Sequence, residues 1–324
     1  MQPTNPTDAA TDMTAPPAAA TVGTFDGVHR GHAVVLRTLA AEARRRGLQP
    51  MVITFDAHPL SVIAPERAPR TLMSASEKLA MLTRFDVTPP LEVRMLHFTP
   101  GMMGLTAHDW MRHLRDTLGV RLIVIGYDNT FGSDGRAMQP EQYVALGREL
   151  GLEVVVAPVV EGCSSSRARR AVAGGDMKLA AEILGRPFSL GGHVGRGDRI
   201  GRTLGFPTAN LMLPDLDSRL LPPNGVYLSR TRLHDGRLYD SVTNIGVRPT
   251  IEGHPEMRIE THLLDFDEDI YDTDIRVCLL ERMRPERKFA SRDELSRAIA
   301  ADKDEARRRT STHEATQAAA MPQP

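Results

Sequence analysis

Residues 108–126, HDWMRHLRDTLGVRLIVIG, place an amphipathic segment directly before a continuous apolar run. The spacing of apolar residues at 108–119 predicts a helix. The run at 120–126 is typical of a strand that is buried on both faces. A helix next to such a strand indicates an open α/β domain with a parallel sheet and helices on both faces.

The same alternation continues on both sides of this stretch. A short strand is predicted to end near Gly23. Ser74 and Glu77 have the spacing of a capping box at the start of a helix. The other helices that we expect lie at 33–47, 74–85, 140–151 and 175–185, and the other strands at 50–55 and 152–160. Residues 21–184 therefore form the predicted α/β domain with an open parallel sheet.

The pattern changes after residue 185, where short alternating segments are separated by turn residues. This spacing predicts an antiparallel barrel or sandwich, of which we favour a small β-barrel. Residues 291–309 predict an amphipathic C-terminal helix, so the second domain is expected at 185–309. Residues 1–20 and 310–324 lack periodicity, and we expect both to be disordered tails.

Composition excludes several classes of function. The 324 residues carry a formal net charge of −1, which gives no reason to expect a nucleic-acid partner. No apolar run approaches the ~20 residues that span a bilayer, and no signal-peptide pattern is present. Only Cys163 and Cys278 occur, which is typical of a reducing compartment. We expect a cytoplasmic protein without a membrane partner, and the sequence does not indicate its oligomeric state.

None of the four lysines follows a glycine, so a Walker-A phosphate loop is absent. The H-E-x-x-H and G-x-S-x-G patterns are absent as well, which removes the common metalloprotease and serine-hydrolase interpretations. If the protein binds phosphates, it must use another arrangement.

The first candidate site is TVGTFDGVHRGH at 21–32, where a strand gives way to a helix. Gly27 and Gly31 permit a tight turn, and the new helix offers free N–H groups to an anion. His29 and His32 share one face of the first turn and could donate to a departing pyrophosphate. Two surface histidines are the alternative. The segments TFDAHP (54–59), GYDNTFG (126–132) and CSSSRARR (163–170) also follow predicted strands, and they favour the site.

The second candidate site is GRGDRIGRTLGFPTAN at 195–210. It nearly matches a dinucleotide fingerprint, but the last glycine gap is too long and Pro207 blocks the required helix. Thr208 and Asn210 offer oxygen ligands for Mg²⁺. Glu260 lies two residues before His262 in a predicted strand and could act as a general base. An ordinary exposed strand glutamate is the alternative for Glu260.

Ten segments occur in one order along residues 21–308, including GTFDGVHRGH, TFDAHP, SSSRAR, GRTLGFPTAN, NIGVRPT and ETHLLDF. In this order the chain resembles the bacterial bifunctional riboflavin kinase/FMN adenylyltransferases, also called FAD synthetases. The resemblance implies a nucleotidylyltransferase-like fold for the first domain. It also implies that His29 and His32 stabilise the transition state of adenylyl transfer from ATP to FMN. The nucleotide- and flavin-binding residues implied for this half are Gly23, Phe25, Asp26, Gly27, His58, Asp128, Ser165 and Arg167.

For the second half, the resemblance implies a riboflavin-kinase barrel. Thr208 and Asn210 would hold Mg²⁺ with ATP, and Glu260 would take the proton from the ribityl 5′-hydroxyl. The glycine-rich segment would contribute further nucleotide-binding residues: Gly195, Gly197, Arg202 and Gly205. The substrates implied are riboflavin, FMN and ATP, and the final product is FAD.

The chain departs from the family pattern at several places. Low-complexity residues 1–20 stand where the family has its first strand, and Thr24 replaces a common Asn. Asn129 and Thr130 stand where an aromatic residue or His and then Arg are usual, and Asp272 replaces a turn glycine. Two alternatives follow: a riboflavin kinase whose impaired adenylyltransferase half only binds flavin or nucleotide, or a first half that serves another phosphorylated alcohol.

Overall fold

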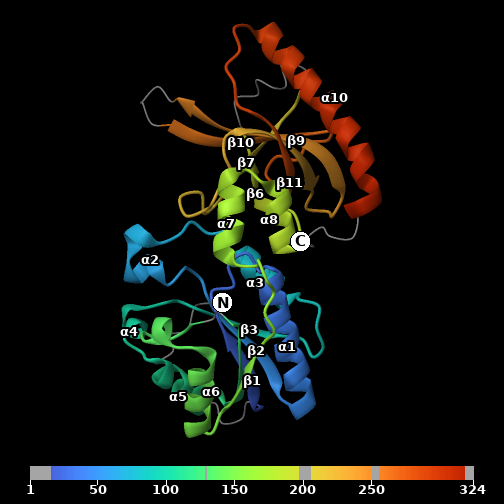
Figure 1. Ribbon diagram of the computed structural model, residues 1–324. Coiled ribbons are helices and arrows are strands. Elements are labelled where there is room, and N and C mark those ends of the chain that lie inside the picture. Colours follow the sequence, from blue (N-terminus) through green and yellow to red (C-terminus); the bar gives the residue numbers. More distant parts are fainter. Residues whose placement is uncertain (1–15, 128–129, 197–205, 250–254, 318–324) are drawn as a thin grey trace. The chain divides into compact units, whose positions relative to one another are not determined.

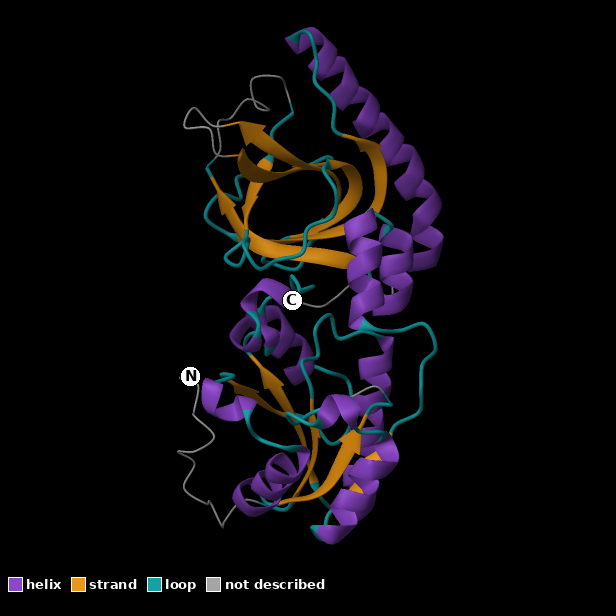
Figure 2. Cartoon of the chain, turned by 60° about the vertical axis from the view of Figure 1, so that its left-hand side comes forward, coloured by secondary structure: helices purple, strands orange, loops and turns teal. Residues whose placement is uncertain are grey.

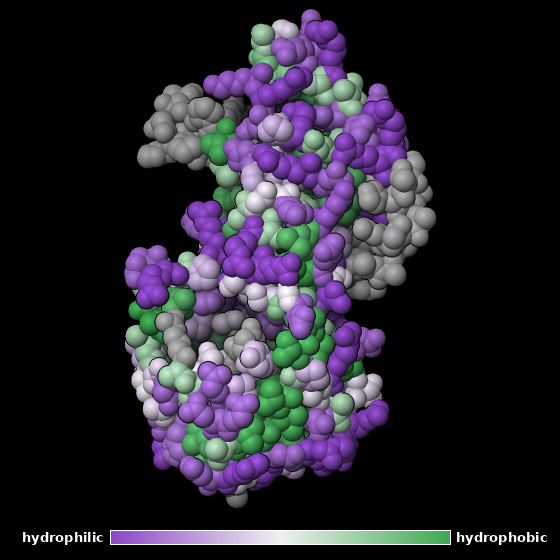
Figure 3. Space-filling model, in the orientation of Figure 1, coloured by the Kyte–Doolittle hydropathy of each residue, from purple (hydrophilic) through white to green (hydrophobic). Residues whose placement is uncertain are grey.

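The computed structural model describes residues 16–127, 130–196, 206–249 and 255–317. The chain forms two compact units, Met1–Ser165 and Ser166–Pro324 (Figure 1). Within these ranges no helix is both long and apolar enough to cross a membrane. The face shown in Figure 3 is largely hydrophilic, with apolar residues gathered in separate patches.

The first unit contains a five-stranded parallel sheet, as predicted. Its strands in spatial order are β3 (Glu92–Leu96), β2 (Gln49–Phe55), β1 (Ala18–Val22), β4 (Val120–Ile125) and β5 (Glu153–Val156). The first strand in the chain thus lies at the centre of the sheet. Strands β2 and β3 lie on one side of β1, whereas β4 and β5 lie on the other. The strand order therefore reverses at β1, which is the topological switch point where open α/β sheets bind ligands.

Helices cover both faces of this sheet, which confirms the prediction. They are α1 (Arg30–Arg46), α2 (Leu60–Ile63), α3 (Ala75–Thr83), α4 (Pro100–Met103), α5 (Ala107–Leu118) and α6 (Pro140–Glu149). Neighbouring strand residues Val52 and Ile53 belong to different apolar clusters, because successive side chains point to opposite faces. One cluster includes residues of α1 and α3, and the other includes residues of α5 and α6.

The short strand predicted to end near Gly23 is present as β1, which ends at Val22. The prediction of a tail up to residue 20 is wrong at its end, and the first strand of the family pattern is not missing. Ala18, Ala19 and Ala20 form most of β1 and are buried. Alanine has low strand propensity, so the segment resembles the tail before it; burial between two neighbouring strands overrides that propensity. Strand β3 was also missed, because the charged residues of EVRML interrupt its apolar pattern at the sheet edge.

The second unit contains α7 (Ser165–Gly174), α8 (Met177–Leu184), a barrel and α10 (Arg292–Gln317). The barrel is closed, which decides between barrel and sandwich, and Figure 2 shows it end-on. Its strands in spatial order are β10 (Pro255–Leu263), β7 (Ala209–Met212), β6 (Phe188–Gly195), β11 (Asp274–Pro285), β8 (Gly225–Arg232) and β9 (Leu238–Pro249). The expected boundary between residues 184 and 185 stays a prediction.

The barrel interior contains a cluster of buried hydroxyl groups. Ser229 Oγ lies 2.8 Å from Ser241 Oγ and 2.7 Å from Thr243 Oγ1. Thr243 Oγ1 in turn donates to Thr261 Oγ1 at 2.9 Å. Because these groups bond to one another, the barrel can bury them without leaving them unsatisfied.

The C-terminal helix is longer than predicted. Helix α10 continues to Gln317, and Thr310 is buried, so the expected tail from residue 310 is wrong over this stretch. The reason is that neither Gly nor Pro interrupts residues 292–317. The unusual Asp272 has φ = 57°, in the left-handed region that favours glycine, so this departure affects a turn, as expected.

Candidate active sites

The first site begins at the carboxyl end of the central strand β1. Residues 23–29 connect β1 to α1, which starts at Arg30. The segments after β2 and β4 leave the same edge of the sheet on either side. The predicted strand-to-helix placement of the motif is therefore confirmed, and the free N–H groups of the α1 N-terminus lie at this edge.

His29 and His32 lie together, as their spacing predicts. Their rings are stacked with centroids 3.6 Å apart and an interplanar angle of 19°. His29 is the N-cap of α1, and its Nδ1 accepts a hydrogen bond from the backbone N–H of His32 at 3.3 Å. Because Nδ1 accepts, a neutral His29 ring carries its proton on Nε2, where it can donate to an anion. A side chain at Gly31 would lie 3.1 Å from the His29 ring, which explains the glycine.

The loop before the histidines has an unusual backbone. Phe25 (φ = 48°) and Val28 (φ = 36°) lie in the left-handed region together with Gly27 (φ = 81°). The Phe25 ring packs 5.0 Å from the His32 ring, and a side chain at Gly23 would lie 3.1 Å from the Phe25 ring. Gly23 and Phe25 thus form a wall beside the histidine pair.

Asp26 is buried beneath this loop. Its carboxylate accepts the Leu72 backbone N–H at 2.9 Å, and its carbonyl accepts the Ser165 hydroxyl at 2.8 Å. The structure therefore brings Ser165 to the loop. The contacts that Asp26 makes shape the loop, and its predicted contact with nucleotide stays a prediction.

The remaining residues predicted for this half are spread over other segments. His58 follows β2, and its Nδ1 accepts the Leu60 backbone N–H at 3.1 Å, so it caps α2. Arg167 is exposed in the first turn of α7. Asp128 lies outside the described residues, while Thr130 beside it is exposed. The ligand contacts of His58, Arg167 and Asp128 stay predictions.

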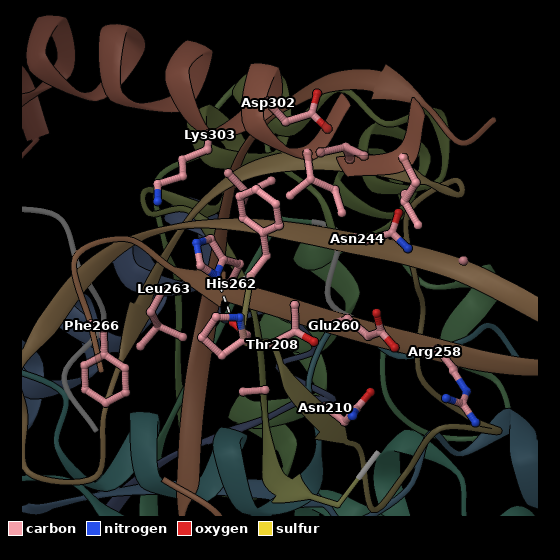
Figure 4. Close-up of a pocket in the computed structure, with 18 of the residues that line it drawn as sticks. Thr208, Asn210, Asn244, Arg258, Glu260, His262, Leu263, Phe266, Asp302 and Lys303 are labelled. Carbon is pink, nitrogen blue, oxygen red and sulfur yellow. Dashed lines mark hydrogen bonds between the residues drawn. The ribbon is translucent and has the colours of Figure 1, made fainter. Parts of the chain in front are cut away.

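The second site is a cavity of about 740 Å³ in the second unit (Figure 4). Strands β7, β9 and β10, the residues 206–208, the loop 266–271 and helix α10 all contribute to its lining. Cavities of roughly 300–1,000 Å³ are the usual size for small-molecule and cofactor sites. The barrel therefore has room for a small ligand at its side.

Glu260 is central to this cavity. Its register partners are Asn210 on β7 and Asn244 on β9, so three polar residues form one row across neighbouring strands. Thr208 precedes Asn210 by two residues, and Figure 4 shows Thr208, Asn210 and Glu260 on the same side of the cavity. The predicted grouping of Thr208, Asn210 and Glu260 is present.

This donor set fits Mg²⁺. The described residues contain no group of three or more His, Cys, Asp or Glu side chains that could hold a metal. The hydroxyl, amide and carboxylate oxygens at the cavity are hard ligands, and Mg²⁺ uses few protein ligands beside water and substrate phosphates. Thr208 and Asn210 are thus suitable ligands for an ion that arrives with a nucleotide.

His262 holds the segment that carries these ligands. Its Nδ1 lies 2.8 Å from the Pro207 carbonyl, and because a carbonyl can only accept, Nδ1–H is the donor. Burial lowers the pKa of His262, and the nearby Lys303 and Arg307 lower it further. The ring is therefore neutral, and it anchors Pro207 directly before Thr208.

The motifs missed Asn244 and Arg258 as cavity residues. The alternation of Arg258, Glu260 and His262 in RIETH places all three on one face and could have indicated Arg258. Of the glycine-rich segment, Gly195 ends β6 opposite Asn210. The predicted residues Gly197, Arg202 and Gly205 lie outside the described part of the chain.

One chain contains an α/β unit with a histidine pair at its switch point and a barrel with an oxygen-lined cavity. Together these features define a two-centre nucleotide-dependent transferase. The family model for FAD synthetase matches residues 11–168, and that for riboflavin kinase matches residues 184–310. The chain belongs to the family of bifunctional riboflavin kinase/FMN adenylyltransferases.

Individual relatives agree over nearly the whole chain. The bifunctional riboflavin kinase/FMN adenylyltransferase of Escherichia coli K12 is 38% identical over 296 residues, covering 89% of this chain and 91% of its own length. That of Bacillus subtilis 168 is 34% identical, covering 88% and 90%. A crystal structure from Streptococcus pneumoniae, described as a macrolide-efflux protein, superposes with a TM-score of 0.80 at 32% identity and covers 94% of this chain and 97% of its own.

Proposed function

We propose that this chain phosphorylates riboflavin with ATP to give FMN, and then adenylylates FMN with ATP to give FAD and pyrophosphate. The family match over both halves supports the two activities. We assign the kinase reaction to the barrel cavity and the adenylyl transfer to the loop after β1. The strongest support for the kinase centre is the row of Asn210, Glu260 and Asn244 across three strands of the cavity wall.

At the kinase centre, Glu260 takes the proton from the ribityl 5′-hydroxyl as this oxygen attacks the γ-phosphorus of ATP and ADP leaves. Thr208 and Asn210 would hold Mg²⁺, which would neutralise charge on the phosphates. Asn244 lies opposite Glu260 and can orient its carboxylate or the attacking hydroxyl. His262 keeps Thr208 in place through the Pro207 carbonyl.

At the adenylyltransferase centre, the FMN phosphate attacks the α-phosphorus of ATP directly, so the protein needs no nucleophile. His29 and His32 donate to the phosphates and stabilise the charge that develops on the pyrophosphate. The N–H groups at the start of α1 add to this stabilisation. Gly27 and Gly31 allow the backbone to approach, and Ser165 and Arg167 keep their predicted role in binding phosphates.

The alternative of an impaired first half is not favoured. The relatives are named for both activities, and the first strand that seemed to be missing is β1. We further propose that the protein is cytoplasmic and acts on small molecules without a nucleic-acid or membrane partner. These last points rest on charge and composition alone.

The test is to incubate the purified chain with riboflavin, ATP and Mg²⁺ and to separate the flavins by chromatography. The unmodified chain should give FMN and then FAD. His29→Ala should lower FAD formation by about 10²–10³-fold and leave FMN formation intact, whereas Glu260→Ala should stop FMN formation and still convert supplied FMN to FAD. If either folded variant lost both reactions equally, the assignment of two separate centres would be wrong.

A further inference from the structure

Lys78 is a buried lysine next to the first site. It lies in α3, and only 7% of its surface is exposed. Its Nζ donates to the carbonyl of Thr24 at 3.0 Å and to the carbonyl of Phe55. Thr24 belongs to the loop after β1 and Phe55 ends β2, so one ammonium group joins the backbones that leave two neighbouring strands.

The loop that Lys78 holds is strained. Non-glycine residues with positive φ, such as Phe25 and Val28, are strained and persist only where surrounding contacts fix them. The Thr24 carbonyl also accepts the Thr54 hydroxyl at 3.2 Å, and Asp26 is fixed through Leu72 and Ser165. Lys78 brings a charged donor to this loop, and it reaches the residue directly before Phe25.

The conformation of Phe25 connects this contact to the histidines. With φ = 48°, Phe25 places its ring 5.0 Å from the His32 ring. His32 in turn stacks on His29 at 3.6 Å. A shift of the Thr24 carbonyl would therefore move Phe25 and then the histidine pair.

The fold buries this cation at a cost. Burial lowers the pKa of Lys78 to about 8, and the attraction of Asp26 and Asp56 offsets only part of this effect. Removing the ammonium group alone would leave the Phe55 carbonyl without this donor, and an acceptor that is buried without a partner destabilises the fold. A loss of stability would therefore not reveal a positioning role, which has to be tested on the reaction itself.

We propose that Lys78 is a positioning residue of the adenylyltransferase centre, which fixes the Thr24–Val28 loop so that Phe25 aligns His32 and His29. This proposal rests on the assignment of that centre to the histidine pair. Lys78 acts through the backbone and is not a catalytic residue.

The test uses Lys78→Met, which keeps the length of the side chain but removes its donors. Lys178→Met is the matched control, since Lys178 is an exposed lysine paired with Glu281. Conversion of FMN to FAD is measured as kcat and as KM for ATP, with riboflavin kinase activity of the same sample as an internal reference. The imidazole signals of His29 and His32 are followed by ¹H–¹³C NMR, assigned with the His29→Ala and His32→Ala variants.

In Lys78→Met, kcat for FAD formation should fall about 100-fold, as expected for a misplacement of catalytic groups by about 1 Å. The histidine signals should shift, and kinase activity should stay within about twofold. Lys78→Arg, which retains charge and donors, should recover part of kcat. Lys178→Met should change neither activity.

The proposal is overturned if folded Lys78→Met forms FAD within twofold of the unmodified rate, or if kcat falls while the histidine signals do not move. If Lys78→Met does not fold, Lys78→Gln is judged by the same criteria. If folded His29→Ala forms FAD within about tenfold of the unmodified rate, the assignment of the centre fails instead, which is a different result from an active Lys78→Met.

Discussion

The two sites of this chain are built in opposite ways. In the first unit, the site residues between Gly23 and His32 are neighbours in sequence, in the loop after β1 and the first turn of α1. In the barrel, Asn210, Asn244 and Glu260 come from three different strands and meet only through strand pairing. The first arrangement depends on backbone conformation, and the second depends on register.

This difference predicts how each site fails. A strained loop loses its shape when one of its fixing contacts is removed, even though the chemical groups remain. A row across paired strands keeps its geometry when one side chain is changed, because the backbone hydrogen bonds hold the other positions. Substitutions in the first unit should therefore act at a distance, and those in the barrel should act locally.

The largest effect is expected at His29, which is both an N-cap and a proposed phosphate ligand. His29→Asn keeps an N-cap acceptor, whereas His29→Ala removes it at a cost of about 1 kcal/mol. Both should lower FAD formation by about 10²–10³-fold, since both remove a donor to the transition state. Turnover of FMN and thermal unfolding are measured together. If His29→Asn retained most of the activity, His29 would serve the helix rather than the phosphates.

The next effect is a pH dependence of stability caused by Lys78. Its pKa falls from 10.5 to about 8 on folding, so between these values the unfolded state binds more protons. Stability therefore rises with pH in this window. The window covers about 2.5 pKa units at 1.36 kcal/mol each, so we expect about 3 kcal/mol between pH 8 and pH 10.5.

This dependence is measured as the difference in the free energy of unfolding between the unmodified chain and Lys78→Met at several pH values. Lys178→Met serves as the control, and it should show no such difference. A flat difference for Lys78→Met would mean that the ammonium group is better solvated than its burial indicates.

A smaller effect is expected at His262, which would test whether the barrel site acts locally. His262→Leu loses the bond to the Pro207 carbonyl, whereas an Asn side chain can still donate from the position of Nδ1. For His262→Leu we expect kcat/KM for ATP in the kinase reaction to fall about tenfold, the equivalent of one lost hydrogen bond. His262→Asn should recover most of it, and FAD formation from FMN should not change. Equal losses in both variants would contradict the anchoring role.

Much of the fold could be predicted from the sequence where periodicity is strong. The amphipathic segment of α5 and the apolar run of β4 have clear patterns, and they lie where predicted. The end of strand β1 near Gly23 was predicted, but its start was not, because the alanines of AAATV carry no strand signal and form a strand only between the neighbours β2 and β4. Helix α10 was predicted too short, since its polar last turns lack an apolar face.

The same physical reason separates the site residues that were found from those that were missed. The pairing of His29 and His32 could be predicted, because residues that are three apart in a helix lie on one face. The contact between Asn244 and Glu260 could not be predicted, because no local sequence pattern determines the register of β9 against β10. The burial of Lys78 could not be predicted either, since a lysine on an amphipathic helix normally lies on the solvent-exposed face.

The smallest effect is expected at Thr130, where the family resemblance of the sequence implies an arginine. Thr130 is exposed, and the adjacent Phe131 is fixed by Tyr143, whose hydroxyl bonds to its backbone N–H and carbonyl. An exposed charge contributes up to about 1 kcal/mol and is screened by salt. Thr130→Arg should therefore lower KM for FMN by about threefold at most, leave kcat unchanged, and lose this gain in high salt. A large, salt-independent rise in kcat would instead show that the surface loop at Thr130 limits the rate of FAD formation. The first site would then differ from the barrel site by a missing charge as well as by backbone strain.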